Sequence, residues 1–173
     1  MSLHIIIDGY NLIRQSDTFR LLDRQSMQRG REALVDVLAA YKKIKSHTIT
    51  VVFDGAQAPP LAPQRDRLKG IFIEFSRNSE SADTVIKRLA RKERQKALVV
   101  SSDCEVVDAA ESYGAATIDT EAFENKINMA HQMDNTTIER DDHESWKPTT
   151  KKKGPSRRLS KRKRRNRVKI KKL

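Results

Sequence analysis

Short apolar runs that alternate with helical patterns constrain the fold of this chain most strongly. The runs are rich in β-branched residues, and they predict strands at residues 3–7, 48–53, 70–75, 97–100 and 115–118. Helical spacing of apolar residues predicts helices over residues 26–45, 81–94 and 103–113, and a last one from Thr120. Alternation of this kind is typical of an α/β fold: a central, mostly parallel sheet between two helical layers.

The charge is distributed very unevenly along the chain. Its 173 residues carry 35 Lys and Arg against 23 Asp and Glu, a formal net charge of +12. Residues 151–173 hold 14 of the basic residues and no acid, so the remainder is close to neutral. We expect a folded domain over residues 1–133, a polar linker over 134–150 and a disordered Lys/Arg-rich tail over 151–173. The tail has too little apolar surface to fold alone, and its removal should leave the domain folded.

Several classes of protein are excluded by what the sequence lacks. The single cysteine, Cys104, excludes a disulfide scaffold, and the four histidines show no metal-ligand spacing. No Gly-x-x-x-x-Gly-Lys-Ser/Thr motif is present to cradle a nucleoside triphosphate. The apolar run at residues 3–7 is too short for a signal peptide or a membrane span. We therefore expect a cytoplasmic protein with no membrane partner and no small-molecule organic cofactor.

Aspartates follow the predicted strands. Asp8, Asp54 and Asp103 each end a strand, and Asp83 lies in the first turn of a predicted helix. Because the carboxyl ends of parallel strands share one edge, these side chains should converge there. Clustered carboxylates repel one another unless a cation is present, and such oxygen ligands favour Mg²⁺ or Mn²⁺. Each aspartate alone is more often a turn former or an N-cap. Asp8-Gly9 and Asp54-Gly55 each predict a turn at the end of a strand, and the small second residue would let a ligand approach the backbone.

Four ordered motifs include these aspartates: Asp8–Ile13, Phe53–Gly55, Ser81–Ile86 and Val100–Asp103. They resemble the motifs of the NYN domain family, in its YacP-like branch of bacterial ribonucleases. The resemblance covers roughly residues 3–125, and the basic tail is not part of its pattern. The resemblance implies a PIN-like three-layer α/β/α sandwich and metal-dependent RNA hydrolysis. By position, the catalytic and metal-binding cluster is matched by Asp8, Asp54, Asp83 and Asp103, and the polar residue of the first motif by Asn11.

The expected function is hydrolysis of RNA phosphodiester bonds by an endoribonuclease that uses Mg²⁺ or Mn²⁺, with mRNA or ribosome-associated RNA as the expected substrate. The metal would lower the pKa of a bound water and neutralise charge in the transition state. One alternative is a non-catalytic RNA-binding or ribosome-associated protein on the same fold. Another is a phosphatase with an aspartyl nucleophile, but that class requires Asp-x-Asp at the first strand, where this chain has Tyr10.

Basic residues near the motifs and in the tail predict contacts with RNA. After Asp83 the predicted helix carries Lys87, Arg88, Arg91 and Lys92, and Arg14 follows the first motif. These side chains are candidate phosphate contacts, and a solvated helix face is the alternative. The tail is expected to bind RNA or the ribosome.

Overall fold

A six-stranded sheet forms the centre of the molecule. The structure is a computed structural model, and it describes residues 2–77, 79–136 and 160–173. The strand order is β3-β4-β2-β1-β5-β6, and every neighbouring pair is parallel except β3 with β4. The strands are β1 (His4–Asp8), β2 (Thr48–Phe53), β3 (Arg65–Leu68), β4 (Ile71–Phe75), β5 (Ala97–Val100) and β6 (Ala116–Ile118). The predicted α/β fold with a mostly parallel sheet is thereby confirmed.

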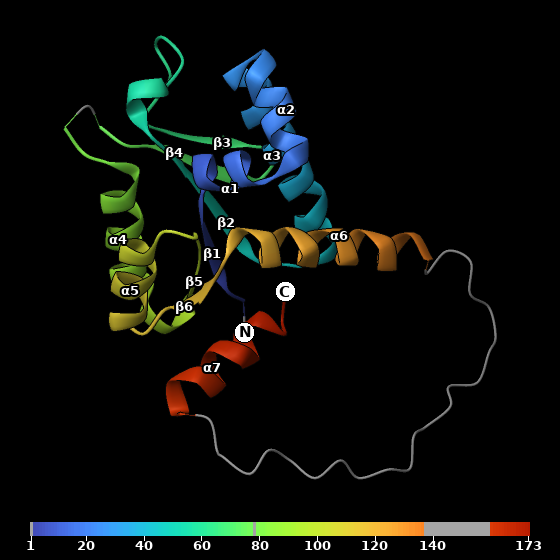
Figure 1. Cartoon of the computed structure of the whole chain (residues 1–173), viewed down its shortest axis with the longest axis vertical. Coiled ribbons are helices and arrows are strands. Elements are labelled where there is room, and N and C mark those ends of the chain that lie inside the picture. Colours follow the sequence, from blue (N-terminus) through green and yellow to red (C-terminus); the bar gives the residue numbers. More distant parts are fainter. Residues whose placement is uncertain (1, 78, 137–159) are drawn as a thin grey trace.

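Helices cover both faces of the sheet, so the molecule has three layers (Figure 1). One layer consists of α1 (Gly9–Gln15), α2 (Asp17–Gln25), α3 (Met27–Ile44) and α6 (Thr120–Thr136). The opposite layer consists of α4 (Ala82–Glu93) and α5 (Cys104–Ser112). Two short 3₁₀ turns, η1 (Gly55–Gln57) and η2 (Arg94–Lys96), precede the third and fifth strands, and α7 (Lys161–Ile170) lies near both chain ends.

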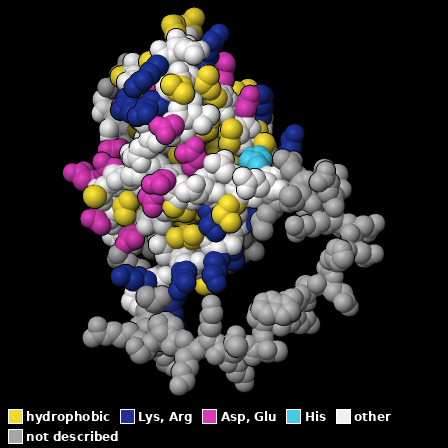
Figure 2. All heavy atoms as spheres, turned by 45° about the vertical axis from the view of Figure 1, so that its right-hand side comes forward, with side chains coloured by type: hydrophobic (Ala, Val, Ile, Leu, Met, Phe, Trp, Pro, Cys, Tyr) yellow, Lys and Arg dark blue, Asp and Glu magenta, His cyan; other side chains and the backbone are white. Residues whose placement is uncertain are grey.

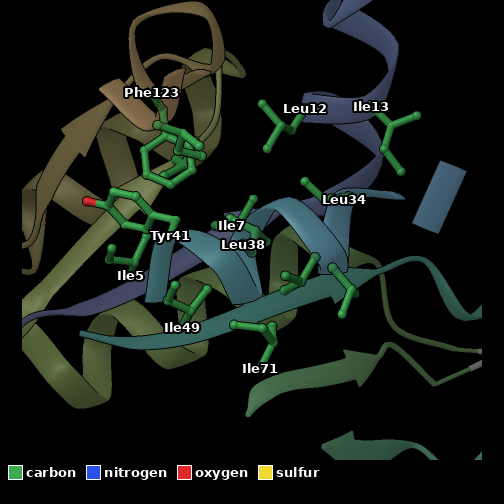
Figure 3. Packing of buried hydrophobic residues seen from close by; sticks show 14 of the residues in the cluster. Ile5, Ile7, Leu12, Ile13, Leu34, Leu38, Tyr41, Ile49, Ile71 and Phe123 are labelled. Atoms are coloured by element: carbon green, nitrogen blue, oxygen red, sulfur yellow. The ribbon is translucent and has the colours of Figure 1, made fainter. Parts of the chain in front are cut away.

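Alternating side chains of the strands supply two separate cores. In β1, Ile5 and Ile7 pack into the larger core beneath α3 and α6, whereas Ile6 faces the smaller core beneath α4 and α5. This alternation is the period of two that a strand imposes on its side chains. Tyr41 of α3 and Phe123 of α6 meet edge-to-face in the larger core, with 6.3 Å between ring centroids (Figure 3).

The structure adds elements that the sequence patterns did not predict. Gly9 was expected to begin a turn, but the chain enters α1 there and continues through α2. Asp8 and Ser16 cap these two helices by accepting hydrogen bonds from Asn11 N and Phe19 N. The antiparallel edge strand β3 was also missed, because all four of its residues are exposed and show no apolar alternation.

The basic tail differs from the expected disorder in its last fourteen residues. Residues 160–173 form α7 and a short extension that packs on the domain, with Ile170 against the larger core and Leu173 buried within it. The structure does not describe residues 151–159, nor residues 137–150, which are most of the expected linker. Helix α6 continues past the expected domain boundary, residue 133, to Thr136. The two apolar side chains explain the difference, because they give a charged segment a surface to bury.

None of the helices in the described part of the chain combines the length and the apolar character needed to cross a bilayer.

Candidate active site

Asp8 is a buried carboxylate at the carboxyl-terminal edge of the sheet. It ends β1, the central strand of the parallel set, and is 9% exposed. Its Oδ1 accepts a hydrogen bond from Asn11 N (3.1 Å), and its Oδ2 accepts a long one from the Ser101 hydroxyl (3.5 Å). Burial raises the pKa of Asp8 to about 6, with the Asn11 N–H opposing the shift and the charges of Asp83 and Asp103 adding to it.

Asp103 lies beside Asp8, after the neighbouring strand β5. It is the N-cap of α5, where its Oδ1 accepts a hydrogen bond from Val106 N (3.1 Å). Ser101 connects the two aspartates, because its hydroxyl oxygen also accepts a hydrogen bond from Asp103 N (3.1 Å). Ser101 is fully enclosed, at 1% exposure, so the strand end that carries Asp103 is fixed relative to Asp8.

Asp83 joins the group from the first turn of α4. Burial raises the pKa of Asp83, and the negative charge of Asp103 is the next largest cause, with smaller contributions from Glu105 and Asp54; Lys87 opposes them. The charges of Asp83 and Asp103 thus act on Asp8, and the charges of Asp103 and Asp54 act on Asp83. The strand order was expected to bring these aspartate side chains together, and the effects of their charges on the pKa values of Asp8 and Asp83 indicate a local excess of negative charge at this edge.

Asp54 ends β2 and caps the turn η1, with its Oδ1 accepting a hydrogen bond from Ala56 N (2.9 Å). The next residue, Gly55, donates its N–H to the Ser76 hydroxyl (2.9 Å), which ties this turn to the end of β4. A Cβ at Gly55 would lie 1.8 Å from the Ser76 carbonyl oxygen, so no larger residue fits without moving the turn.

The small residue after each of two aspartates was expected to let a ligand approach the backbone, and the structure corrects this interpretation. A Cβ at Gly9 would lie 2.3 Å from the Phe53 ring, and at Gly55 the Ser76 carbonyl fills the space. Protein atoms occupy both positions. The Asp-Gly pairs therefore serve close packing between the strand ends rather than access for a ligand.

The side chain of Asn11 connects the first motif to the fourth through hydrogen bonds. Its side-chain oxygen accepts hydrogen bonds from Ser102 N (3.3 Å) and from the Gln15 amide (3.2 Å). Ser102 in turn donates its hydroxyl to Gln15 (3.0 Å) and lies 2.9 Å from the Thr120 hydroxyl. Asn11 thereby connects α1, which follows Asp8, to the segment that carries Asp103.

The donor set has the chemistry of a site for a hard divalent cation. Among the residues that the structure describes, no three acidic, histidine or cysteine side chains are close enough to hold a metal ion together. Mg²⁺, however, commonly keeps several of its waters and takes one or two carboxylates together with substrate phosphate oxygens. Asp54 and Asp103 each commit one oxygen to a helix cap and leave the second available. The residues fit a cation of this kind, bound largely through water.

The predicted RNA contacts lie in different environments. On α4, Lys87 forms an ion pair with Glu105 (3.4 Å), and Arg88 forms ion pairs with Glu74 (3.0 Å) and Glu80 (2.7 Å). Arg91 and Lys92 are exposed in the last turn of α4, at the end of the helix away from Asp83. Arg14 lies 5.8 Å from the centre of the Tyr10 ring. Their contact with RNA stays a prediction.

Sequence reasoning missed one buried cation beside the first two motifs. Arg31 of α3, 8% exposed, donates hydrogen bonds to the Tyr10 hydroxyl (2.6 Å) and to the Gln57 carbonyl (2.9 Å). It therefore connects α1, which follows Asp8, to the turn that follows Asp54. The helical pattern of residues 26–45 gave no signal for this role, because a single arginine among apolar positions resembles an exposed residue.

Comparison with known proteins shows the family to which the chain belongs. The chain belongs to the YacP-like NYN domain family, whose model matches residues 5–172. The family is a nuclease-type domain with the PIN-like fold, which places the chain among the hydrolases in general terms. The match includes the basic C-terminal segment, which corrects the expectation that this segment lies outside the family pattern.

The relatives in question come from Bacillus subtilis. Uncharacterized protein YacP of strain 168 is 26% identical over 87 residues, which are 50% of this chain and 51% of that protein. The chain thus matches only about half the length of this curated relative. The crystal structure of Rae1 (YacP) shares the fold with a TM-score of 0.67 at 22% identity, covering 80% of each chain. A tryptophan-to-leucine variant of that protein matches with a TM-score of 0.65 at 22% identity, covering 80% of this chain and 86% of the other.

Proposed function

We propose that this chain is a metal-dependent endoribonuclease that hydrolyses RNA phosphodiester bonds in the cytoplasm with Mg²⁺ or Mn²⁺. The observation that carries the proposal is the gathering of four aspartates at one sheet edge in a chain of a nuclease-type family. Three of these aspartates cap a helix or turn, but like charges disfavour one another, so their proximity costs stability that a bound cation would offset.

The protein residues have distinct roles in this proposal. Asp8, supported by Asp83 and Asp103, would hold the cation, and Asp54 would hold it or its waters. A bound divalent cation supplies an activated water and offsets negative charge on the phosphate under attack. Ser101 and Asn11 keep the strand ends in register, because each bonds to two of the segments that carry aspartates.

The basic C-terminal segment supplies a second part of the proposal. We assign it to contacts with RNA or with RNA in the ribosome, because it adds 14 positive charges to a domain that is otherwise near neutral. Phosphate contacts of this type depend strongly on salt and weakly on sequence. A non-catalytic RNA-binding protein would need these cations, but repulsion among four carboxylates at one sheet edge would bring it no advantage.

Cleavage of a defined RNA tests the proposed activity. Circular single-stranded RNA is incubated with the purified chain in Mg²⁺, in Mn²⁺ and in EDTA, and the products are separated by size. We expect linear products with either metal and none with EDTA, since a circle has no end for an exonuclease. The variant Asp8→Asn should be inactive, and Asp108→Asn, at an exposed position on α5, should remain active. Equal cleavage in EDTA, or full activity of Asp8→Asn, would overturn the proposal.

A further inference from the structure

Helix α7 is anchored to the domain by contacts along its length. Asn166 accepts a hydrogen bond from Thr117 N of the edge strand β6 (3.1 Å), and the Tyr41 hydroxyl donates to the Leu173 carbonyl oxygen (3.1 Å). A ring nitrogen of His47 lies 3.2 Å from the Lys172 carbonyl oxygen. Together with burial of Leu173, these contacts hold the basic helix in one place on the domain.

A hollow of about 650 Å³ lies between α7 and the domain. Its apolar surface comes from Leu3, Gly114 and Val168, the last of which is 56% exposed. Gln95 is its one uncharged polar side chain, and no acidic residue contributes. Its cations are Lys96, Arg164, Arg165, Lys169 and Lys172.

The cations of this hollow lack acidic partners in the part of the chain that the structure describes. Each salt bridge there involves other residues, and the Lys169 amino group instead donates to the Ala97 carbonyl oxygen (3.5 Å). Burial lowers the pKa of Lys169, and the positive charge of Arg165 lowers it further. Basic side chains gather at this lower end of the molecule in Figure 2. Such crowding of like charge is relieved by a bound anion.

The hollow is separate from the carboxylates. Leu3 and Ala97 lie where β1 and β5 begin, whereas Asp8 and Asp103 lie where these parallel strands end. A strand of five residues spans roughly 16 Å, so the two sites stand at opposite ends of the sheet. Neither site contributes a residue to the other.

We propose that this hollow binds a nucleotide of an RNA strand whose other part is held at the carboxylate edge. The apolar surface suits one face of a base, and the surrounding cations suit the phosphates on either side of it. The exposed residues Lys163, Arg167 and Lys171 extend the positive charge of α7 beyond the hollow. A free mononucleotide would leave them unused, whereas a polymer would engage them. This inference rests on the proposed function in taking RNA as the ligand.

Two double variants separate this site from general charge attraction. Arg164→Glu with Arg165→Glu alters the lining of the hollow, and Arg24→Glu with Arg29→Glu makes the same change in charge at exposed positions of α2 and α3, away from the hollow. Binding of a fluorescent 20-nucleotide single-stranded RNA is measured in EDTA, over a range of salt concentrations. Binding under these conditions does not depend on cleavage, so a failure of the proposed activity would leave this test intact.

We expect the lining variant to bind at least about tenfold more weakly, with a salt slope shallower by roughly 1.4 if two phosphate contacts are lost. The control variant should lose less than about threefold. Equal losses in the two variants, or none in either, would overturn the site, and so would ATP binding as tightly as the 20-nucleotide RNA. Thermal unfolding of both variants verifies that α7 stays docked, and photocrosslinking of thiouridine-containing RNA to residues 160–173 of the unaltered chain gives a readout that needs no variant. Absence of that crosslink would also contradict the proposal.

Discussion

Replacement of Asp8 by asparagine should stabilise the metal-free protein at neutral pH, although it should abolish catalysis. Burial together with neighbouring charges raises the pKa of Asp8 from 3.8 to about 6. Between these two pH values the folded state holds a proton that the unfolded chain releases, so stability falls as the pH rises through this window. Above pH 6 the full penalty applies, roughly 3 kcal/mol at 1.36 kcal/mol for each pKa unit.

Asparagine removes this penalty and keeps most of the local structure. It is as good an N-cap as aspartate, so the hydrogen bond from Asn11 N that starts α1 is retained. The weak hydrogen bond from the Ser101 hydroxyl is lost or rearranged, which lowers the net gain in free energy of unfolding to about 1–2 kcal/mol. For a chain of this size the gain corresponds to a rise in Tm of at least about 2 °C.

The assay is thermal unfolding in EDTA from pH 4.5 to 8 for the unaltered chain, Asp8→Asn and Asp108→Asn. We expect the advantage of Asp8→Asn to be small at pH 4.5, to grow up to about pH 6 and then to level off. Asp108→Asn, at an exposed position on α5, should show no such trend. An Asp8→Asn protein that is less stable than the unaltered chain at pH 7, or a difference that does not vary with pH, would refute the reasoning.

Three further changes test separate parts of the structure. Ser101→Ala removes a hydrogen bond that lowers the pKa of Asp8, so the acid limb of the cleavage pH profile should move to higher pH; an unmoved limb would contradict the assignment. Gly55→Ala places a methyl group against the Ser76 carbonyl and should cost roughly 1–3 kcal/mol in chemical denaturation; unchanged stability would show that the turn is adaptable. Leu173→Ala should lower the free energy of unfolding by about 2 kcal/mol, which is at the low end for a buried leucine, and should therefore lower the Tm. An unchanged Tm would indicate that the tail is disordered.

The place of the aspartates at the strand ends could be predicted, because it depends on local apolar patterns and on the rule that parallel strands end at one edge of the sheet. The runs that became β1, β2 and β5 are apolar and short, and parallel pairing then places the aspartates after them at one edge. The effect of neighbouring carboxylates on the pKa values of Asp8 and Asp83 is the physical expression of that placement.

Long-range contacts could not be predicted in the same way. Arg31 reaches Tyr10 and Gln57 from a helix whose sequence shows only its apolar face, and no local pattern encodes the two partners. The docking of α7 depends on Ile170 and Leu173, two apolar residues among many cations. The basic composition of the segment predicted disorder. Two apolar side chains are nevertheless enough to dock it, because the domain offers a core in which they can be buried.

Binding of a divalent cation at the carboxylates of the sheet edge can be measured directly at Cys104. This residue is the single cysteine of the chain, it is exposed, and it follows Asp103. A spin label on Cys104 reports nearby Mn²⁺ through broadening of its spectrum. We expect saturable broadening in the unaltered chain and in Asp108→Asn, and its loss in Asp8→Asn and on addition of EDTA. Saturable broadening that persists unchanged in Asp8→Asn, or its absence from the unaltered chain, would contradict the proposed binding of the cation.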